Sequence, residues 1–165
     1  NLGLKEKVIK KALKDFSGVQ RRLTKVFKKN KIEFYDDYAH HPTEIEAVLE
    51  GVKTVAGKRQ IISVFQPHRY SRVKSLQLEF ASCFKNSDQV ILCPIYAAGE
   101  PIDKTYKEKK FAQLISKLSR TQVILIDNES NLTKYFRKNL IKDEIVIGMG
   151  AGSISKWIYN LKKIL

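Results

Sequence analysis

Four short runs of the chain are apolar almost throughout, at residues 60–65, 90–93, 123–126 and 144–147. A strand without polar alternation must be covered on both faces, which is the environment of a mostly parallel sheet. Between and after these runs, apolar residues recur at helical spacing, near residues 43–56, 73–84, 111–118, 132–140 and 154–161. This alternation predicts one α/β domain: a doubly wound, mostly parallel sheet with right-handed crossovers and helices on both faces.

The N-terminal part of the chain departs from this alternation. Residues 21–27 and 32–38 flank Lys28-Lys29-Asn30-Lys31, a pattern that predicts two antiparallel strands joined by a short turn. Upstream, residues 1–15 have helical periodicity and are followed by the breaker Phe16-Ser17-Gly18. We assign residues 1–18 to the tail of a preceding domain and a linker, and residues 19–165 to a Rossmann-like domain that opens with a β-hairpin. The start lacks Met and any signal-peptide pattern, so we expect an excised piece of a longer protein.

The formal net charge of +14 admits a nucleic-acid-binding α/β module as an alternative class. The lysines, however, are spread over nearly every segment, which is typical of a solvated basic surface, and the recognised base-stacking motifs are absent. No apolar run is long enough to cross a bilayer. Cys83 and Cys93 lie in apolar surroundings, as reduced core residues do. We therefore expect a cytoplasmic protein with no membrane partner and no specific nucleic-acid partner.

Polar residues gather where the second hairpin strand ends, in the run Asp36-Asp37-Tyr38-Ala39-His40-His41-Pro42. In an open α/β sheet, ligands bind at the carboxyl ends of the strands. A carboxylate here can accept two hydroxyls, as ribose recognition requires, and the histidines can bind a carboxylate, move a proton or ligate a metal. Adjacent histidines point apart and no third ligand is evident, so we predict no metal ligands. The alternative is that the acids cap the following helix.

A second polar run, His68-Arg69-Tyr70-Ser71-Arg72, opens the helix expected after the 60–65 strand. Arg69 and Arg72 are three residues apart and share a helix face if the helix has begun by Arg69. Two guanidinium groups on one face form a clamp for a carboxylate or a phosphate. The alternative is a pair of surface arginines that bind Asp or Glu side chains of the same protein.

The run Gly148-Met149-Gly150-Ala151-Gly152-Ser153 connects the last strand to the last helix. It is similar to a phosphate-binding turn, although its spacing is not G-x-G-x-x-G. Close packing of the helix on the strand explains the glycines equally well. No G-x-x-x-x-G-K-[ST] motif occurs in the sequence, so the chain has no triphosphate-binding loop of that type.

Taken in order, the segments at residues 16–22, 36–44, 65–72, 96–100 and 150–152 resemble the Mur ligases, the ATP-dependent amide-bond-forming enzymes of peptidoglycan synthesis. They span almost the whole chain, and the second and third are highly specific. The resemblance is to the C-terminal domain of the family member that adds L-alanine to UDP-N-acetylmuramate. A sister ligase of cell-wall recycling, which attaches a preformed tripeptide, shares the His-His-Pro corner but lacks the His-Arg-Tyr-Ser-Arg element.

The resemblance implies a reaction and a set of partners. ATP phosphorylates the muramate carboxylate, and the alanine amine attacks the resulting acyl phosphate. The family has an N-terminal UDP-sugar domain, a central P-loop domain and a mobile C-terminal domain, so the missing P-loop would lie in the central domain. ATP and Mg²⁺ would be held mainly there, and the present chain alone should be inactive.

The family's binding residues carry over to seven positions of this sequence. Arg22 resembles the arginine that reaches the nucleotide phosphates, and Asp37 resembles the acid that contacts the ATP ribose. The group that holds alanine and its carboxylate resembles Tyr38, His40, Arg69 and Arg72, with His68 adjacent.

Two positions depart from the family pattern: Ala39 stands where glycine is common, and Leu23 where phenylalanine is common. Both changes affect local geometry rather than the reaction class.

Besides the nucleic-acid-binding module, a free-standing regulatory domain that binds carboxylates stays an alternative. A gene that continues upstream into a P-loop would exclude it.

Overall fold

The structure is a computed structural model that describes residues 5–15 and 19–165. In this part of the chain, six strands form a single sheet in the order β1-β2-β6-β3-β4-β5. Their bounds are β1 Thr24–Lys29, β2 Ile32–Asp37, β3 Ile61–Phe65, β4 Gln89–Leu92, β5 Gln122–Leu125 and β6 Ile145–Met149. Only β1 is antiparallel to its neighbour, and all other pairs are parallel. The predicted doubly wound, mostly parallel sheet with an N-terminal hairpin is confirmed.

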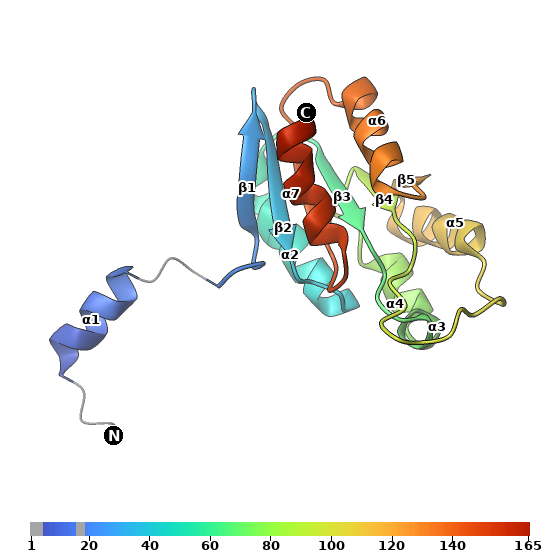
Figure 1. Cartoon of the computed structure of the whole chain (residues 1–165), viewed down its shortest axis with the longest axis horizontal. Helices are drawn as coiled ribbons and strands as arrows, with labels where there is room; N and C mark the ends of the chain where they lie inside the picture. Colours follow the sequence, from blue (N-terminus) through green and yellow to red (C-terminus); the bar gives the residue numbers. More distant parts are fainter. Residues whose placement is uncertain (1–4, 16–18) are drawn as a thin grey trace.

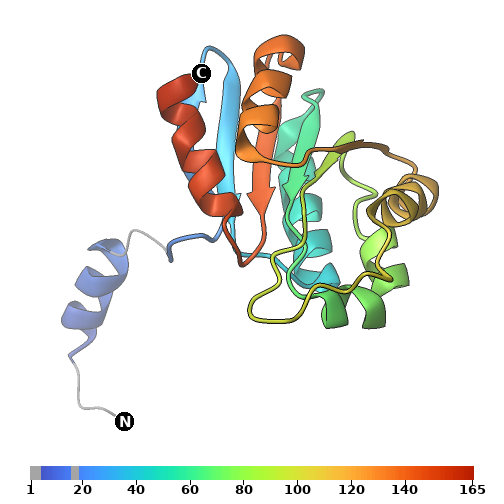
Figure 2. The same ribbon diagram turned by 45° about the vertical axis from the view of Figure 1, so that its right-hand side comes forward.

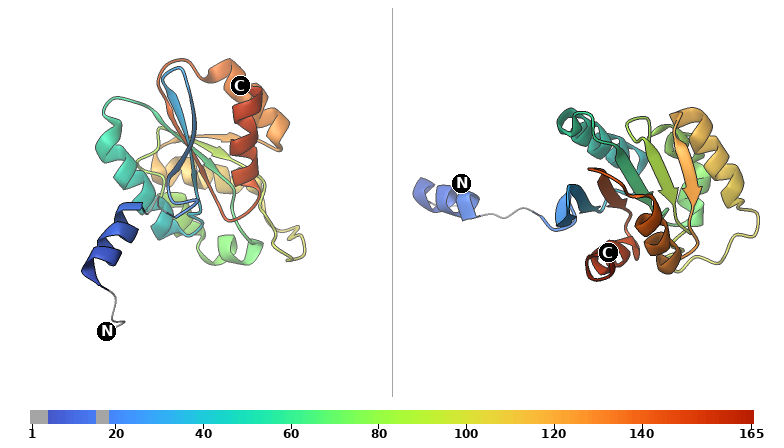
Figure 3. Two further views of the ribbon diagram at one scale, coloured as in Figure 1. Left: turned by 60° about the vertical axis from the view of Figure 1, so that its left-hand side comes forward. Right: turned by 90° about the horizontal axis from the view of Figure 1, so that it is seen from above.

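Helices cover both faces of the sheet (Figures 1 and 3). The bounds are α1 Glu6–Asp15, α2 Pro42–Ala56, α3 Tyr70–Ser75, α4 Gln77–Ser82, α5 Glu108–Ser119, α6 Glu129–Asn139 and α7 Ile154–Ile164. One buried cluster joins α2, α3, α4 and α5 to the sheet, and a second cluster joins α6 and α7 to the opposite face. Figure 2 shows α6 and α7 side by side over the strands. The alternating strand residues that fill the two clusters explain why the strand sequences are apolar throughout.

Several boundaries differ from the sequence-based expectation for local reasons. β1 begins at Thr24 rather than at residue 21, because Arg21 and Leu23 have φ of 57° and 46° and cannot extend a strand. The helix expected over 73–84 is two short helices that meet at Leu76, where ψ is 30°. A helix at Glu6–Asp15 is confirmed, whereas residues 1–4 and the predicted breaker Phe16-Ser17-Gly18 lie outside the described residues.

The hydrophobic interior also accounts for the two cysteines. Cys83 and Cys93 are free and buried, as predicted. Burial raises the pKa of both thiols far above the usual range, which keeps them protonated. Among the described helices, none is long and apolar enough to cross a membrane.

The strand order creates a crevice at the carboxyl edge of the sheet. β6, the last strand in sequence, lies between β2 and β3. The chain leaves β3 toward α3 on one face, and it leaves β6 toward α7 on the other. Loops that diverge in this way open a space between neighbouring strand ends, where ligands of open α/β sheets bind. The polar runs singled out in the sequence follow β2, β3 and β6 at this edge.

Candidate functional site

Four aromatic and imidazole rings form a continuous row across the carboxyl edge. The ring centroids of Tyr38 and His40 lie 5.2 Å apart, those of His40 and His68 lie 5.8 Å apart, and His68 stacks on Tyr96 at 5.7 Å. Tyr38 and His40 follow β2, His68 follows β3, and Tyr96 follows β4. The structure therefore brings together three of the predicted site residues and adds Tyr96, which belongs to a motif quoted above but was not predicted as a site residue.

Arg69 lies outside the helix that it was expected to open. It has φ of 69° and ψ of 133°, a conformation that is costly for a residue with a side chain, and α3 begins one residue later. Its N–H donates to the carbonyl of Tyr96 at 2.9 Å, which holds this backbone in place. The condition for a shared helix face with Arg72 is therefore not met. Arg72 approaches the imidazole of His68, and the positive charges of both arginines lower the pKa of that ring.

Arg72 lies in the first turn of α3 and points back to the row of rings. Its Nη1 is 3.4 Å from Nδ1 of His68. Burial, reinforced by the positive charge of Arg72, lowers the pKa of His68 below its usual value. No carboxylate of the described residues forms an ion pair with Arg72 or with Arg69. The predicted alternative, arginines that bind acids of the same protein, has no close ion pair in its favour here, although the charge of Arg69 acts on Glu100.

Asp37 is a buried structural anchor in this structure. Only 2% of its surface is exposed. Its Oδ2 accepts from the N–H of Leu23 at 2.6 Å, and its Oδ1 accepts from the N–H of Ala39 at 2.7 Å. The two donors are the residues at which the chain departs from the family pattern. Each carboxylate oxygen keeps a second lone pair, so a ligand hydroxyl can bind only if the 21–23 corner exposes it.

Arg21 is a site residue that the sequence analysis did not identify. Its Nη2 donates to the carbonyl of Gly150 at 2.5 Å, and its Nε lies 3.4 Å from Oδ2 of the fully buried Asp36. Its guanidinium carbon lies 4.6 Å from the centre of the Tyr38 ring. Arg21 thus ties the entrance of the domain to the ends of β2 and β6. Arg21 and Arg22 are adjacent arginines, and nothing in the sequence indicates that Arg21, and not Arg22, makes these contacts.

Arg22, the predicted phosphate contact, takes no part in these bonds. It is exposed, and its charge acts on Glu44 at the start of α2. No hydrogen bond or ion pair of its side chain occurs among the described residues. An exposed, uncommitted arginine at the domain entrance is available to a ligand or to another domain.

Glu44 organises the start of α2 from inside the helix. Its Oε2 accepts from the backbone N–H groups of His40 and His41, at 3.0 and 3.2 Å, and lies 3.3 Å from Nδ1 of the His40 ring. Burial alone would raise the pKa of Glu44, but these donors outweigh it and the pKa is lowered. The carboxylate therefore stays ionised beside an imidazole of the site. Glu44 was not among the residues predicted to form the site.

The glycine turn after β6 is shaped by close packing. A Cβ on Gly150, which has φ of 147°, would lie 2.7 Å from the carbonyl oxygen of Gln66. A Cβ on Gly152 would lie 2.5 Å from both the Gln66 side chain and the Tyr96 ring. Gln66 is buried, and its Oε1 accepts from the N–H of Ile154 at 3.0 Å. The packing explanation given above for these glycines thus has a direct structural basis.

The long loop after β4 holds the start of α3. Glu100 accepts hydrogen bonds from the N–H of Ser71 at 3.1 Å and from its hydroxyl. These two bonds lower the pKa of Glu100. The N–H of Tyr96 donates to the carbonyl of Pro67 at 2.8 Å. The loop therefore fixes both His68 and α3, and with them the position of Arg72.

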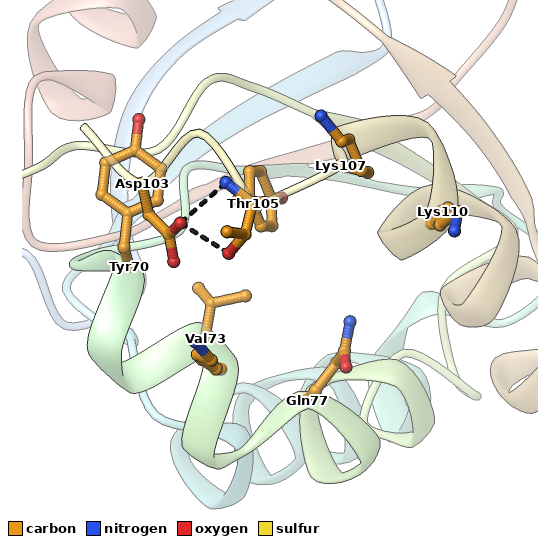
Figure 4. Close-up of a pocket in the computed structure, with 9 residues that line it drawn as sticks. Tyr70, Val73, Gln77, Asp103, Thr105, Lys107 and Lys110 are labelled. Atoms are coloured by element: carbon orange, nitrogen blue, oxygen red, sulfur yellow. Dashed lines mark hydrogen bonds between the residues drawn. The ribbon is translucent and has the colours of Figure 1, made fainter.

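A separate cavity of about 220 Å³ lies beside this site, between α3 and the loop that leads to α5 (Figure 4). Val73 of α3 and Gln77 of α4 face it from one side, and Lys107 and Lys110 approach from the other. Asp103 accepts from the N–H and the hydroxyl of Thr105, at 2.8 and 2.6 Å, and shapes the loop. None of the seven predicted site residues lines the cavity. It is a neighbour of the carboxyl-edge site and not part of it.

Metal ligands are not grouped in the described part of the chain. No three His, Cys, Asp or Glu side chains there lie close enough together to hold a metal ion. The described residues therefore offer no group of three such ligands for a Mg²⁺ ion. What they offer is a partly buried row of rings flanked by two guanidinium groups, an arrangement suited to a small ligand that carries a carboxylate.

The sequence is similar to known ligases over nearly its full length. Residues 21–152 match the family model described as Mur ligase, glutamate ligase domain. The UDP-N-acetylmuramate–L-alanine ligase of Pelagibacter ubique (strain HTCC1062) is 46% identical over 164 residues, which cover 99% of this chain and 35% of that protein. The corresponding ligase of Bartonella bacilliformis is 38% identical over 164 residues, with 99% and 34% covered. This chain thus spans about a third of the length of these curated relatives.

Solved structures agree with the sequence relationship. The UDP-N-acetylmuramate–alanine ligase of Thermotoga maritima superposes with a TM-score of 0.73 at 26% identity, covering 93% of this chain and 31% of that one. A murein peptide ligase of Psychrobacter arcticus also reaches a TM-score of 0.73, at 19% identity and with 93% and 32% covered, and supports the fold alone. With the family model, the relatives and the fold in agreement, this chain belongs to the Mur ligase family.

Proposed function

We propose that this chain is the amino-acid-binding, C-terminal domain of an ATP-dependent ligase that joins L-alanine to UDP-N-acetylmuramate in peptidoglycan synthesis. The observation that carries the proposal is the pair Arg69 and Arg72, uncommitted to any carboxylate of the described residues, beside the row of rings at the carboxyl edge. The chain's 46% identity to a ligase named for alanine supports the choice of substrate. A cytoplasmic location, where ATP is available, is part of this proposal.

In this proposal, Arg72 and Arg69 bind the carboxylate of alanine, and the rings of Tyr38, His40 and His68 surround the rest of the molecule. The muramate carboxylate is first converted by ATP into an acyl phosphate, whose phosphate is a good leaving group. The alanine amine then attacks the acyl carbon. An acyl phosphate hydrolyses unless water is excluded, and a domain that closes over the site can provide that exclusion.

Nucleotide contacts are proposed for Arg22 and Asp37. The exposed guanidinium of Arg22 supports a contact to phosphates that are presented by another domain. Asp37 requires a movement of the 21–23 corner before it can reach a ribose, because both of its oxygens already bind backbone N–H groups. Mg²⁺ and the triphosphate are proposed to be held mainly outside this chain. We therefore expect the isolated chain neither to hydrolyse ATP nor to form an amide bond.

The alternative substrate is the tripeptide of the sister ligase, but the murein peptide ligase structure is only 19% identical and supports the fold alone. A nucleic-acid-binding module, the alternative from a different class, rests only on the net charge. Binding of unrelated DNA or RNA at physiological ionic strength, lost at higher salt, would support that class.

The test is phosphate release by the full-length protein that contains this chain, with ATP, Mg²⁺ and UDP-N-acetylmuramate present. Separate reactions receive L-alanine, the tripeptide or no acceptor. We expect release that depends on L-alanine. Release only with the tripeptide would assign the chain to the sister ligase, and no release with either acceptor would refute a ligase function.

A further inference from the structure

The His40 ring is held in one tautomer by two groups that can only accept hydrogen bonds. Its Nδ1 lies 3.0 Å from the carbonyl oxygen of Tyr38 and 3.3 Å from Oε2 of Glu44. A carbonyl and an ionised carboxylate have no proton to donate, so Nδ1 must carry the hydrogen. In the neutral ring, Nε2 is then an acceptor with a free lone pair. No described residue forms a hydrogen bond with that nitrogen.

The neighbouring imidazole is held in the opposite tautomer. Nδ1 of His68 faces Nη1 of Arg72 at 3.4 Å, and a guanidinium group can only donate. The lone pair of His68 is thus on Nδ1, and its hydrogen is on Nε2. The two rings are 5.8 Å apart, so one base and one donor lie side by side at the carboxyl edge.

We infer that His40 is the general base that takes a proton from the alanine ammonium group, with Glu44 as its positioning residue. This inference rests on the proposed function, because it concerns the amine that attacks the acyl phosphate. An amine bound as its ammonium ion has no lone pair and cannot attack. A carboxylate that fixes Nδ1–H and stabilises the imidazolium is the arrangement by which acids support catalytic histidines in other enzymes.

The proton and electron balance of the step is complete. The alanine ammonium group gives one proton to Nε2 of His40, and the freed lone pair forms the C–N bond to the acyl carbon. The C–O bond to the phosphate breaks, and phosphate leaves with its electron pair. A second N–H proton passes to the departing phosphate as the amide forms, and the imidazolium of His40 returns its proton to water. ATP, already part of the proposed function, is the only other reactant.

Glu44 has a geometry suited to this role beyond its part in the helix. The same oxygen that faces the His40 ring accepts the backbone N–H groups of His40 and His41. These bonds fix the carboxylate relative to the ring and keep it ionised. His41 is a matched comparison, because its ring contacts the hydroxyl of Thr43 at 2.9 Å and forms no ion pair with an acid of the described residues.

The test uses the full-length protein with His40→Gln, Glu44→Gln and, as the control, His41→Gln. We expect His40→Gln to lower alanine-dependent turnover by about 10²-fold or more, the usual contribution of a general base. The acid limb of its pH profile should move to alkaline pH, where free amine is present in solution. Glu44→Gln removes the charge that favours the imidazolium, so the limb should move to lower pH. His41→Gln should keep the wild-type profile.

Hydroxylamine distinguishes loss of the general base from loss of the earlier step, the formation of the acyl phosphate. It is unprotonated at neutral pH and attacks an acyl phosphate without a base, giving a hydroxamate. We expect His40→Gln to form hydroxamate at the wild-type rate while its reaction with alanine is slow. Loss of both reactions, or an unchanged alanine reaction, would overturn the assignment. If the wild-type protein forms no hydroxamate from ATP and UDP-N-acetylmuramate, the proposed ligase function fails, and the base assignment with it.

A third readout needs no turnover. Nitrogen NMR of the 165-residue chain distinguishes the two tautomers of each neutral histidine. We expect hydrogen on Nδ1 in His40 and on Nε2 in His68. Hydrogen on Nε2 in His40 would leave no base facing the substrate and would overturn the inference.

Discussion

The corner after β2 and the corner before α3 lie side by side, but they differ in whether their charged side chains are bound by partners within the chain. At the first, the carboxylates of Asp36, Asp37 and Glu44 are bound by hydrogen-bond donors of the chain itself. At the second, Arg72 contacts the imidazole of His68, and neither Arg69 nor Arg72 forms an ion pair with a carboxylate of the described residues, although the charge of Arg69 acts on Glu100. The acids therefore stabilise the edge of the sheet, whereas the arginines have no such bonds within the described residues and can accept a ligand, as proposed.

This difference follows from what each group can reach. A carboxylate at a strand end meets the unpaired backbone N–H groups of the loop that follows, and these bonds compensate its burial. The guanidinium groups of Arg69 and Arg72 form no ion pair with an acid of the described residues, and the nearby Glu100 accepts hydrogen bonds from Ser71 instead. Polar residues of similar appearance in the sequence thus divide into those that stabilise the edge and those available for binding.

The largest effect on activity is expected when Arg72, which has no acidic partner among the described residues, is replaced. Arg72→Ala should raise the KM for alanine by about 30-fold to 3,000-fold in the full-length protein, because one charged partner of a carboxylate is typically worth about 2 to 5 kcal/mol. Lys74→Ala is the control, since Lys74 lies on the same helix and lines the neighbouring cavity instead. Phosphate release against alanine concentration measures the effect. An unchanged KM would show that the α3 corner does not bind the substrate carboxylate.

The next largest effect is on stability and concerns Asp37, whose carboxylate is bound by backbone N–H groups of the chain. Asp37→Ala leaves the N–H groups of Leu23 and Ala39 without their acceptor, so we expect the free energy of unfolding to fall by about 2 to 3 kcal/mol. Urea unfolding of the chain measures it. Asp127→Ala, which changes an exposed acid, should alter stability by less than about 0.5 kcal/mol. Equal stabilities for the two variants would mean that Asp37 is kept for ligand binding and not for the fold.

The glycines test whether close packing, rather than phosphate binding, shapes the turn after β6. Gly150→Ala should destabilise the chain by about 1 to 3 kcal/mol, because the new methyl group meets the Gln66 carbonyl at a φ that alanine rarely adopts. Gly51→Ala, in the middle of α2 with nothing within 4 Å, should stabilise it by about 0.5 to 1 kcal/mol. Thermal unfolding of both variants is the measurement, and the same sign for both would contradict the packing argument.

The fold could be predicted from the sequence because its signals are local. Apolar runs and helical periodicity depend on only a few neighbouring residues. They predicted the alternation of strands and helices, the N-terminal hairpin and the carboxyl edge of the sheet at which the loops meet. The errors also have local causes. The positive φ of Arg21 and Leu23 delays β1, and Leu76 divides the helix expected over 73–84. Spacing alone does not encode these backbone turns.

The site could be predicted only in part, because its geometry depends on contacts between distant segments. Tyr38, His40 and His68 meet as rings, which the sequence suggested through their positions at strand ends. The conformation of Arg69 depends on the carbonyl of Tyr96, and the commitment of Asp37 depends on the N–H of Leu23. Neither partner is identifiable from a single sequence.

The smallest predicted effect is a pH dependence of stability due to His68. Burial and the charge of Arg72 lower its pKa, and Arg69 and a protonated His40 act in the same direction, whereas Glu100 opposes them. The unfolded chain therefore binds a proton more readily than the folded one. The stability that this ring contributes is present above the unfolded pKa of about 6.5 and is lost as the pH falls toward the lower folded pKa.

His68→Asn should remove this contribution. We expect the difference in urea midpoint between about pH 8 and about pH 5 to be smaller in the variant than in the wild type, since both histidines at 40 and 41 remain in each. A wild type that gains stability on acidification relative to the variant would mean that His68 binds its proton in the folded state. That result would mean that the negative charge of Glu100 outweighs burial and the arginines at His68, so the charges of the corner before α3 would be balanced within the chain.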